Sequence, residues 1–265
     1  MTIPHSLLAR KRVAGFLRWL NRHGWSRFFL EAFAGFQRPF ATMQEARLAA
    51  DKIGLGSHEE PSNVALHLNK GQSARLSDYP VLFRLQECLL RTRKVLDLGG
   101  NVGNLFYCYE KYLQIPKDLT WTVYDLPRTL DAGRSLAKNR QETKLRFVDQ
   151  LDNLEQCDVL LVSGSMHYLE PPLLELLKQS RHHPRWVIIN RVPLSERDTY
   201  YAVQRDHHIA VACRVEKLDS VKSGMDNLGY DLTDSWQIPD RNLIMPFFPD
   251  YSVDSYRGLF FTIRD

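Results

Sequence analysis

From Lys94 onward, the sequence alternates short apolar runs of β-type residues with stretches of helical periodicity. The runs are Val95–Leu98, Trp121–Tyr124, Leu145–Val148, Val159–Val162 and Trp186–Ile189. Helical patterns lie at 103–113, 128–139 and 171–181. Strands that alternate with helices form parallel sheets through right-handed crossovers. The alternation therefore predicts an α/β fold with a mostly parallel sheet, and Gly258–Ile263 is expected to supply a last, antiparallel strand.

The first part of the chain has a different texture. Residues 6–38 follow a helical pattern that Gly24 and Gly35 interrupt, and further helices are expected at 43–53 and 79–92. We therefore predict two parts, a helical N-terminal extension over 1–78 and an α/β domain over 79–265. Another helix is predicted at 214–227, beyond the point where the alternation loosens.

Composition and cysteine usage exclude several classes of protein. Hydrophobic residues make up 44% and charged residues 25%, as in ordinary globular proteins. No apolar stretch approaches the roughly 18 residues needed to cross a bilayer, and charged residues interrupt any signal-peptide core near the start. The four cysteines lie far apart without a CxxC pair, so neither a disulfide framework nor a metal site is expected. These features favour a cytoplasmic location.

The net charge of +4 is distributed unevenly. Residues 1–40 carry seven Lys and Arg but one acidic residue, so the remaining 225 residues carry −2. A near-neutral body with a basic arm is not typical of a nucleic-acid-binding domain, and no nucleic-acid partner is expected.

The most informative segment runs from Val95 to Gly103, a strand that leads through glycines into a helix. In this setting backbone N–H groups and a helix N-terminus meet a ligand. Gly99, Gly100 and Gly103 let the backbone turn tightly, and Asn101 also tolerates a positive φ. The alternative interpretation is a plain strand–helix turn. Asp97 before the glycines would repel a pyrophosphate but attract an ammonium group.

The ends of the next two strands carry further acids. Asp125, followed by Leu126 and the helix-starting Pro127, can accept both hydroxyls of a ribose. A ligand with an ammonium and a ribose but no phosphate is S-adenosylmethionine. Asp149 follows the third strand, where it could reach the adenine amino group or serve equally well as a turn or helix-capping residue.

Together these motifs resemble the class I S-adenosylmethionine-dependent methyltransferases over about residues 80–265. Four segments are more closely similar to a bacterial methyltransferase family associated with surface-polysaccharide and secondary-metabolite genes: Val95–Gly100, Ser163–Pro172, Ile189–Pro193 and Tyr256–Phe261. The resemblance implies a Rossmann-like domain, S-adenosylmethionine as cofactor and S-adenosylhomocysteine as product. Transfer to an oxygen of a small molecule or sugar is favoured. Asn101 stands where many class I enzymes have glycine.

The reacting end is expected beyond the fourth and fifth strands. Ser163, His167 and Tyr168 should border the methyl group, with His167 as candidate base or as a packing residue. Arg191 could hold an acceptor carboxylate or phosphate, or pair with a nearby acid. His207 and His208 could line the acceptor pocket or belong to a solvated loop.

Three rival classes were weighed against this interpretation. A nicotinamide-dependent oxidoreductase would want GxGxxG, and Asp97 argues against it. A nucleic-acid amino-methyltransferase would place a Pro-Pro-aromatic motif directly after the fourth strand, whereas Pro171 and Pro172 come later and no aromatic follows. A degenerate methyltransferase fold that serves as a binding or scaffold protein is the remaining alternative.

The N-terminal arm must bury its large apolar side chains, and three destinations compete. It could pack on its own domain as a lid over the acceptor site, contact a second subunit in a homodimer, or lie on an anionic membrane surface. We favour the lid, with a dimer contact as an addition, over the membrane.

Overall fold

The computed structural model describes residues 36, 38–56, 73–151, 157–205, 209–245 and 247–265. The chain divides into two compact units. The sheet unit contains 59–192, 221–238 and 257–265, and the hairpin unit contains 1–58, 193–220 and 239–256. Most of the predicted helical segment at 6–38 lies outside the described residues.

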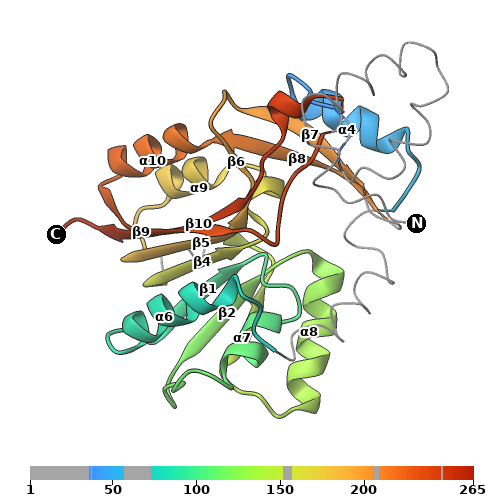
Figure 1. Ribbon diagram of the computed structural model, residues 1–265. Helices are drawn as coiled ribbons and strands as arrows, with labels where there is room; N and C mark the ends of the chain where they lie inside the picture. The colour runs from blue at the N-terminus through green and yellow to red at the C-terminus, as the bar shows by residue number, and fades with distance from the viewer. Residues whose placement is uncertain (1–35, 37, 57–72, 152–156, 206–208, 246) are drawn as a thin grey trace. The chain divides into compact units, whose positions relative to one another are not determined.

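The sheet unit is built on a seven-stranded sheet in the order β3-β2-β1-β4-β5-β10-β9 (Figure 1). Its strands are β1 Lys94–Leu98, β2 Thr120–Tyr124, β3 Leu145–Val148, β4 Val159–Ser163, β5 Trp186–Val192, β9 Tyr230–Ile238 and β10 Tyr256–Ile263. The first five are parallel, and β10 runs antiparallel to β5. The predicted α/β fold is confirmed.

Helices cover the two faces of this sheet. The helices α6 Asp78–Leu89, α7 Asn104–Tyr109 and α8 Pro127–Asn139 contribute to the core with Trp121 and Val123 of β2. Figure 1 shows α9 Leu173–Gln179 and α10 Leu218–Asn227 on the opposite face. All five residues of β4 are buried, as expected of a central parallel strand, whereas only alternate residues of β2 are buried.

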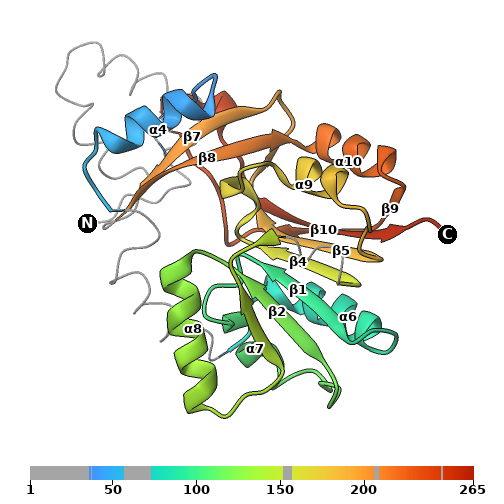
Figure 2. The same ribbon diagram turned by 180° about the vertical axis from the view of Figure 1, so that it is seen from behind.

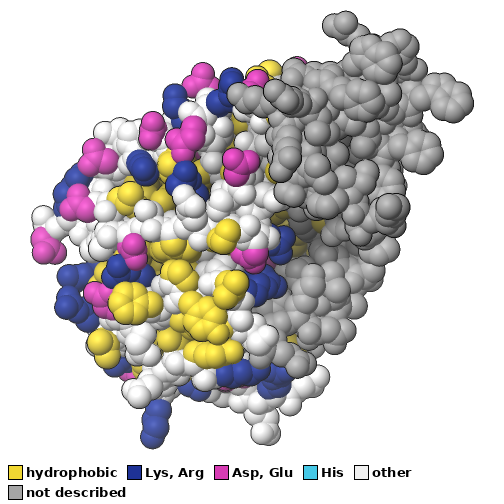
Figure 3. Space-filling view, viewed as in Figure 1, with side chains coloured by type: hydrophobic (Ala, Val, Ile, Leu, Met, Phe, Trp, Pro, Cys, Tyr) yellow, Lys and Arg dark blue, Asp and Glu magenta, His cyan; other side chains and the backbone are white. Residues whose placement is uncertain are grey.

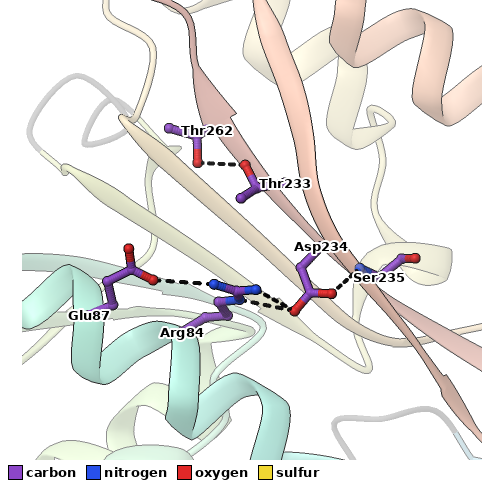
Figure 4. A network of polar contacts seen from close by, with 6 residues as sticks. All are labelled: Arg84, Glu87, Thr233, Asp234, Ser235 and Thr262. Carbon is purple, nitrogen blue, oxygen red and sulfur yellow. Dashed lines mark hydrogen bonds and ion pairs between the residues drawn. The ribbon is translucent and has the colours of Figure 1, made fainter.

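A charged network ties α6 to the edge strand β9 (Figure 4). Arg84 on α6 donates from Nε and Nη2 to Asp234 Oδ2 at 3.0 and 2.8 Å, and from Nη1 to Glu87 at 3.3 Å. Thr233 Oγ1 donates to Thr262 Oγ1 at 2.9 Å and links β9 to β10. These bonds fix which side of α6 faces the sheet.

The outer side of α6 carries an apolar patch, which Figure 3 shows as a group of hydrophobic side chains over this helix. Its members are Leu76, Tyr79, Phe83, Leu90 and the neighbouring Tyr112, which are 46% to 74% exposed. Patches of this kind mark interaction surfaces. This face of α6 is therefore a candidate interaction surface, distinct in sequence from the N-terminal arm that carries the predicted dimer contact.

The hairpin unit contains a second, smaller sheet. Strands β7 Tyr200–Arg205 and β8 Ala210–Lys217 pair antiparallel, and β6 Leu194–Ser195 pairs with β8. Helix α4 Met43–Asp51 lies along the hairpin (Figure 2), with Ala46 and Ala50 buried against Val203. The helix predicted at 214–227 is wrong at its start, because β8 continues to Lys217 before α10 begins.

Residues just before α4 extend the small sheet. Phe40 exchanges backbone hydrogen bonds with Tyr201 at 2.8 and 3.0 Å, and Phe36 forms an isolated bridge with Gln204. Thr42 caps α4 by accepting the backbone N–H of Glu45. The described part of the N-terminal extension is thus joined to β7. None of the described helices is long and apolar enough to cross a membrane.

Candidate cofactor-binding site

Parallel register brings the ends of β1, β2 and β3 to one edge of the sheet. Leu98 pairs with Tyr124, and Tyr124 pairs with Val148. The residues that follow these three positions are Gly99, Asp125 and Asp149. Neighbouring strands are about 4.8 Å apart. The predicted site residues therefore lie in a row along the carboxyl edge, where doubly wound sheets bind ligands.

The glycine loop has a conformation that its sequence requires. Gly99, Asn101 and Gly103 have φ values of 75°, 61° and 86°. A Cβ at Gly99 would lie 2.3 Å from Ser165 Cβ, and one at Gly100 would lie 2.4 Å from Asp97 Cγ. Ser165 Oγ also donates to the carbonyl of Leu98 at 2.5 Å. Side chains therefore pack directly against the loop backbone.

Asn101 adopts the left-handed conformation without being glycine. Its Oδ1 accepts the backbone N–H of Val102 at 3.0 Å. Asparagine tolerates this region because its short side chain can make such local bonds. The departure from the usual family glycine therefore leaves a turn of the same hand.

Asp97 is a buried carboxylate with an unsatisfied oxygen. It is 1% exposed, and its Oδ2 accepts the indole N–H of Trp121 at 3.3 Å. Its Oδ1 has no hydrogen-bond partner within the described residues. Burial raises the pKa of Asp97 to about 7. The negative charge of the nearby Asp125 also raises this pKa, whereas the hydrogen bond from Trp121 lowers it. Such a group is stabilised by a cationic ligand.

Asp125 joins the glycine loop to α8. Its Oδ2 accepts the backbone N–H of Asn101 at 2.8 Å, and its Oδ1 accepts the N–H of Leu126 at 2.7 Å. Leu126 is the N-cap residue of α8 and is 41% exposed. A carboxylate oxygen can accept more than one hydrogen bond, so these two bonds do not by themselves exclude a diol. Asp149 is exposed directly after β3.

The end of β4 contains a buried polar chain that the sequence did not reveal. Ser163 Oγ accepts a hydrogen bond from Asn190 Nδ2 at 3.2 Å, and Asn190 Oδ1 accepts one from Trp236 Nε1 at 3.1 Å. Asn190 and Ser163 are paired across β4 and β5. Asn190 directly precedes Arg191 in the Ile189–Pro193 segment. The resemblance of that segment to the methyltransferase family was the sequence signal that could have revealed Asn190. Ser163 therefore bonds to a neighbouring strand, in addition to its predicted role at the cofactor site.

His167 and Tyr168 lie in a short 3₁₀ helix, Met166–Tyr168, just beyond β4. His167 is 5% exposed, and its ring centroid is 4.0 Å from that of Tyr168 at an interplanar angle of 46°. A buried ring against an aromatic neighbour has a fixed orientation, which both a base and a packing residue require. The base role stays a prediction.

Arg191 lies at the carboxyl end of β5, one strand beyond Ser163 in the sheet order. Its Nη2 donates to the carbonyl of Ser163 at 3.3 Å. The structure thus places Ser163, His167, Tyr168 and Arg191 together around the ends of β4 and β5. His207 and His208 lie outside the described residues.

One cavity in the sheet unit has a volume of about 270 Å³ and runs along β1, β2 and β3. Its lining includes Lys94 and Thr120 at the amino ends of β1 and β2 and Val148 at the carboxyl end of β3. Among the described residues, no group of three or more His, Cys, Asp or Glu side chains is placed to hold a metal ion.

No family model and no curated protein matches the sequence. Solved structures do match the fold. The 1,6-didemethyltoxoflavin-N1-methyltransferase of Burkholderia thailandensis, with bound 1,6-didemethyltoxoflavin and S-adenosylhomocysteine, is 19% identical with a TM-score of 0.52 over 86% of this chain and 93% of its own. Magnesium protoporphyrin IX methyltransferase of Synechocystis is 11% identical, with a TM-score of 0.49 over 85% and 100% of the two chains. The CcbJ methyltransferase of Streptomyces caelestis is 12% identical, with a TM-score of 0.49 over 72% and 92%. The first of these similarities, together with the strand order, shows that this chain has the Rossmann-like fold of the class I methyltransferases.

Proposed function

We propose that this protein is an S-adenosylmethionine-dependent methyltransferase that acts on a small molecule or sugar. The observation that carries the proposal is the buried Oδ1 of Asp97, which has no partner among the described residues. It lies beneath a glycine loop at the edge where the fold binds ligands. A carboxylate in that position accepts the ammonium of the methionine moiety and repels a pyrophosphate.

The neighbouring residues fit the rest of this cofactor. The carboxylate of Asp125 would accept the two ribose hydroxyls, and Asp149 would accept the adenine amino group one strand further along. Leu126 is apolar and exposed, so it would pack against the nucleoside. The backbone of Gly99, Gly100, Asn101 and Gly103 would pass close to the ligand, with no Cβ at the three glycines.

When bound, the cofactor supplies an electrophilic methyl group on a sulfonium. We assign His167 to accept the proton of the acceptor hydroxyl at a ring nitrogen, with Tyr168 holding its ring in place. Oxygen is the acceptor atom that the family resemblance favours, and a hydroxyl acceptor must lose its proton during transfer. The N-terminal extension, residues 1–78, is proposed to close over the acceptor, with His207 and His208 in its pocket.

Calorimetry with S-adenosylhomocysteine, S-adenosylmethionine and NAD tests the cofactor assignment. We expect both adenosyl compounds to bind and NAD not to bind. Turnover is then sought with labelled S-adenosylmethionine against hydroxylated small molecules and sugars. Binding without turnover of any acceptor would favour the scaffold alternative, whereas binding of NAD would contradict the cofactor assignment.

A cytoplasmic location is part of the proposal, since the enzyme needs cytoplasmic S-adenosylmethionine. All four cysteines are unbonded, and three of them are buried. Burial raises the pKa of Cys88, Cys157 and Cys213 to about 12, so these thiols are poor nucleophiles.

A further inference from the structure

Arg191 combines two unfavourable features at the carboxyl end of β5. Its φ is 54°, in the left-handed region, which costs free energy for a residue that carries a Cβ. Its Nε and Nη1 are buried and have no hydrogen-bond partner in the part of the chain that the structure describes. Strained residues of this kind persist where the surrounding structure imposes them, and they cluster at ligand sites.

The guanidinium of Arg191 is held weakly. Its hydrogen bond to the Ser163 carbonyl is 3.3 Å long, at the far end of the normal range. None of the ion pairs formed between described residues includes Arg191. Gly164 lies beside it, where even an added Cβ would stand 3.6 Å from Nε. An anion that reached Nε and Nη1 would therefore displace no ion pair of Arg191 with a described residue.

The backbones of Asp97 and Arg191 are not adjacent in the sheet. Asp97 pairs with Leu161, and Leu161 pairs with Ile188, so Asp97 and Ile188 are two strand spacings apart. That separation is about 10 Å, and Arg191 lies three residues, about 10 Å, further along β5. In S-adenosylmethionine the ammonium and the carboxylate share one carbon atom. A carboxylate held next to Asp97 therefore starts nearer β1 than β5, and the affinity of Arg191→Gln for S-adenosylhomocysteine distinguishes the two anions.

We propose that Arg191 anchors a carboxylate or phosphate group of the methyl acceptor. This inference rests on the proposed function and narrows its substrate class to acidic hydroxylated compounds. A guanidinium presents a planar fork of donors that matches either anion with two parallel hydrogen bonds. Pairing would satisfy the buried nitrogens and bring the acceptor to the ends of β4 and β5, where His167 lies.

The test uses benzoate and inorganic phosphate as probes of the full-length protein loaded with S-adenosylhomocysteine. Calorimetry should show that at least one probe binds the wild type. Arg191→Gln should bind that probe at least tenfold more weakly. Arg191→Lys keeps the charge but not the planar fork, so its affinity should lie between the two. The control is Arg185→Gln, which changes an arginine just before the opposite end of β5 and should leave probe binding unchanged. Affinity for S-adenosylhomocysteine should stay within about twofold in all variants.

Several results would overturn this inference. Failure of the wild type to bind either probe, or equal binding by Arg191→Gln, would remove the anion anchor. A loss of S-adenosylhomocysteine affinity in Arg191→Gln alone would assign the guanidinium to the cofactor's carboxylate. Thermal melting adds a separate readout, because a structural arginine would lower the melting temperature when replaced, whereas an unpaired one should not. The probes are also titrated into the protein without S-adenosylhomocysteine. Anion binding at Arg191 is then tested even if the cofactor assignment fails.

Discussion

The carboxylate of Asp125 accepts the backbone N–H of Asn101 at 2.8 Å. The residue that we propose to bind the ribose therefore also holds the glycine loop in place. Its other oxygen holds the N–H of Leu126 at the start of α8. The loop and the ribose position are therefore set by one side chain. Replacing Asp125 removes one contact to the loop and one to the start of α8, together with any bond to the cofactor.

Asp125→Ala should weaken binding of S-adenosylhomocysteine by at least the roughly 1–3 kcal/mol expected for unsatisfied ribose hydroxyls. Asp125→Asn keeps one acceptor oxygen and should lose less. Calorimetry measures both, and circular dichroism reports whether the fold survives. Asp131→Ala, which removes an exposed acid on α8, is the control and should bind normally. Unchanged affinity in a folded Asp125→Ala protein would contradict the assignment.

Cofactor binding should depend on pH through Asp97. The folded-state pKa of about 7 means that the carboxylate is mostly protonated at pH 6 and mostly ionised at pH 8. An ammonium prefers the ionised form, so affinity for S-adenosylhomocysteine should rise about tenfold from pH 6 to pH 8. Calorimetry at pH 6 and pH 8 should show that Asp97→Asn binds S-adenosylhomocysteine more weakly than the wild type. The affinity of the variant should also change much less between the two pH values. The same rise in both proteins would assign it to another group.

The same group predicts how stability changes with pH. Because the pKa of Asp97 is higher in the folded than in the unfolded protein, the folded state binds more protons between about pH 4 and pH 7. The contribution of Asp97 to the free energy of unfolding therefore falls as pH rises through that range. Urea unfolding should show that the free energy of unfolding of Asp97→Asn, relative to that of the wild type, increases from pH 5 to pH 7. Above pH 7 this difference should stay constant. A constant difference would exclude a raised pKa.

Sequence reasoning predicted the parallel core because its signals are local. The apolar run Val159–Val162 reads as a buried strand without knowledge of its neighbours, and Pro127 indicates the start of α8. Parallel register then follows from the fold. Parallel register is also why the sequence alone places Asp97, Asp125 and Asp149 at one edge of the sheet.

The small sheet of the hairpin unit was missed because its signals are not local. Ala210–Lys217 mixes apolar and charged residues, and its end continues into the helical pattern of α10. Its strand form depends on pairing with β7. The unsatisfied oxygen of Asp97 was equally hidden, since it depends on burial and on contacts from Trp121 and Gly100.

His167→Ala should reduce the turnover number by roughly 10²–10⁴-fold if His167 is the base. Affinity for S-adenosylhomocysteine should be unchanged, because the histidine contacts the acceptor side. His182→Ala, which changes an exposed histidine before the amino end of β5, serves as the control and should keep the wild-type turnover number. An unchanged rate at saturating acceptor would assign His167 to packing.

Deletion of residues 1–35 should separate cofactor binding from methyl transfer. The cut leaves Phe36 and Phe40, whose backbone bridges to β7 belong to the small sheet, so the remaining chain keeps these contacts. The glycine loop, Asp97 and Asp125 are untouched, and S-adenosylhomocysteine should bind with the affinity of the full chain. Turnover should fall at least tenfold if the arm closes over the acceptor, because access of water and misplacement of the acceptor both slow transfer. Full turnover in the truncated protein, with salt-sensitive binding of the intact chain to anionic vesicles, would instead assign the basic arm to a membrane surface.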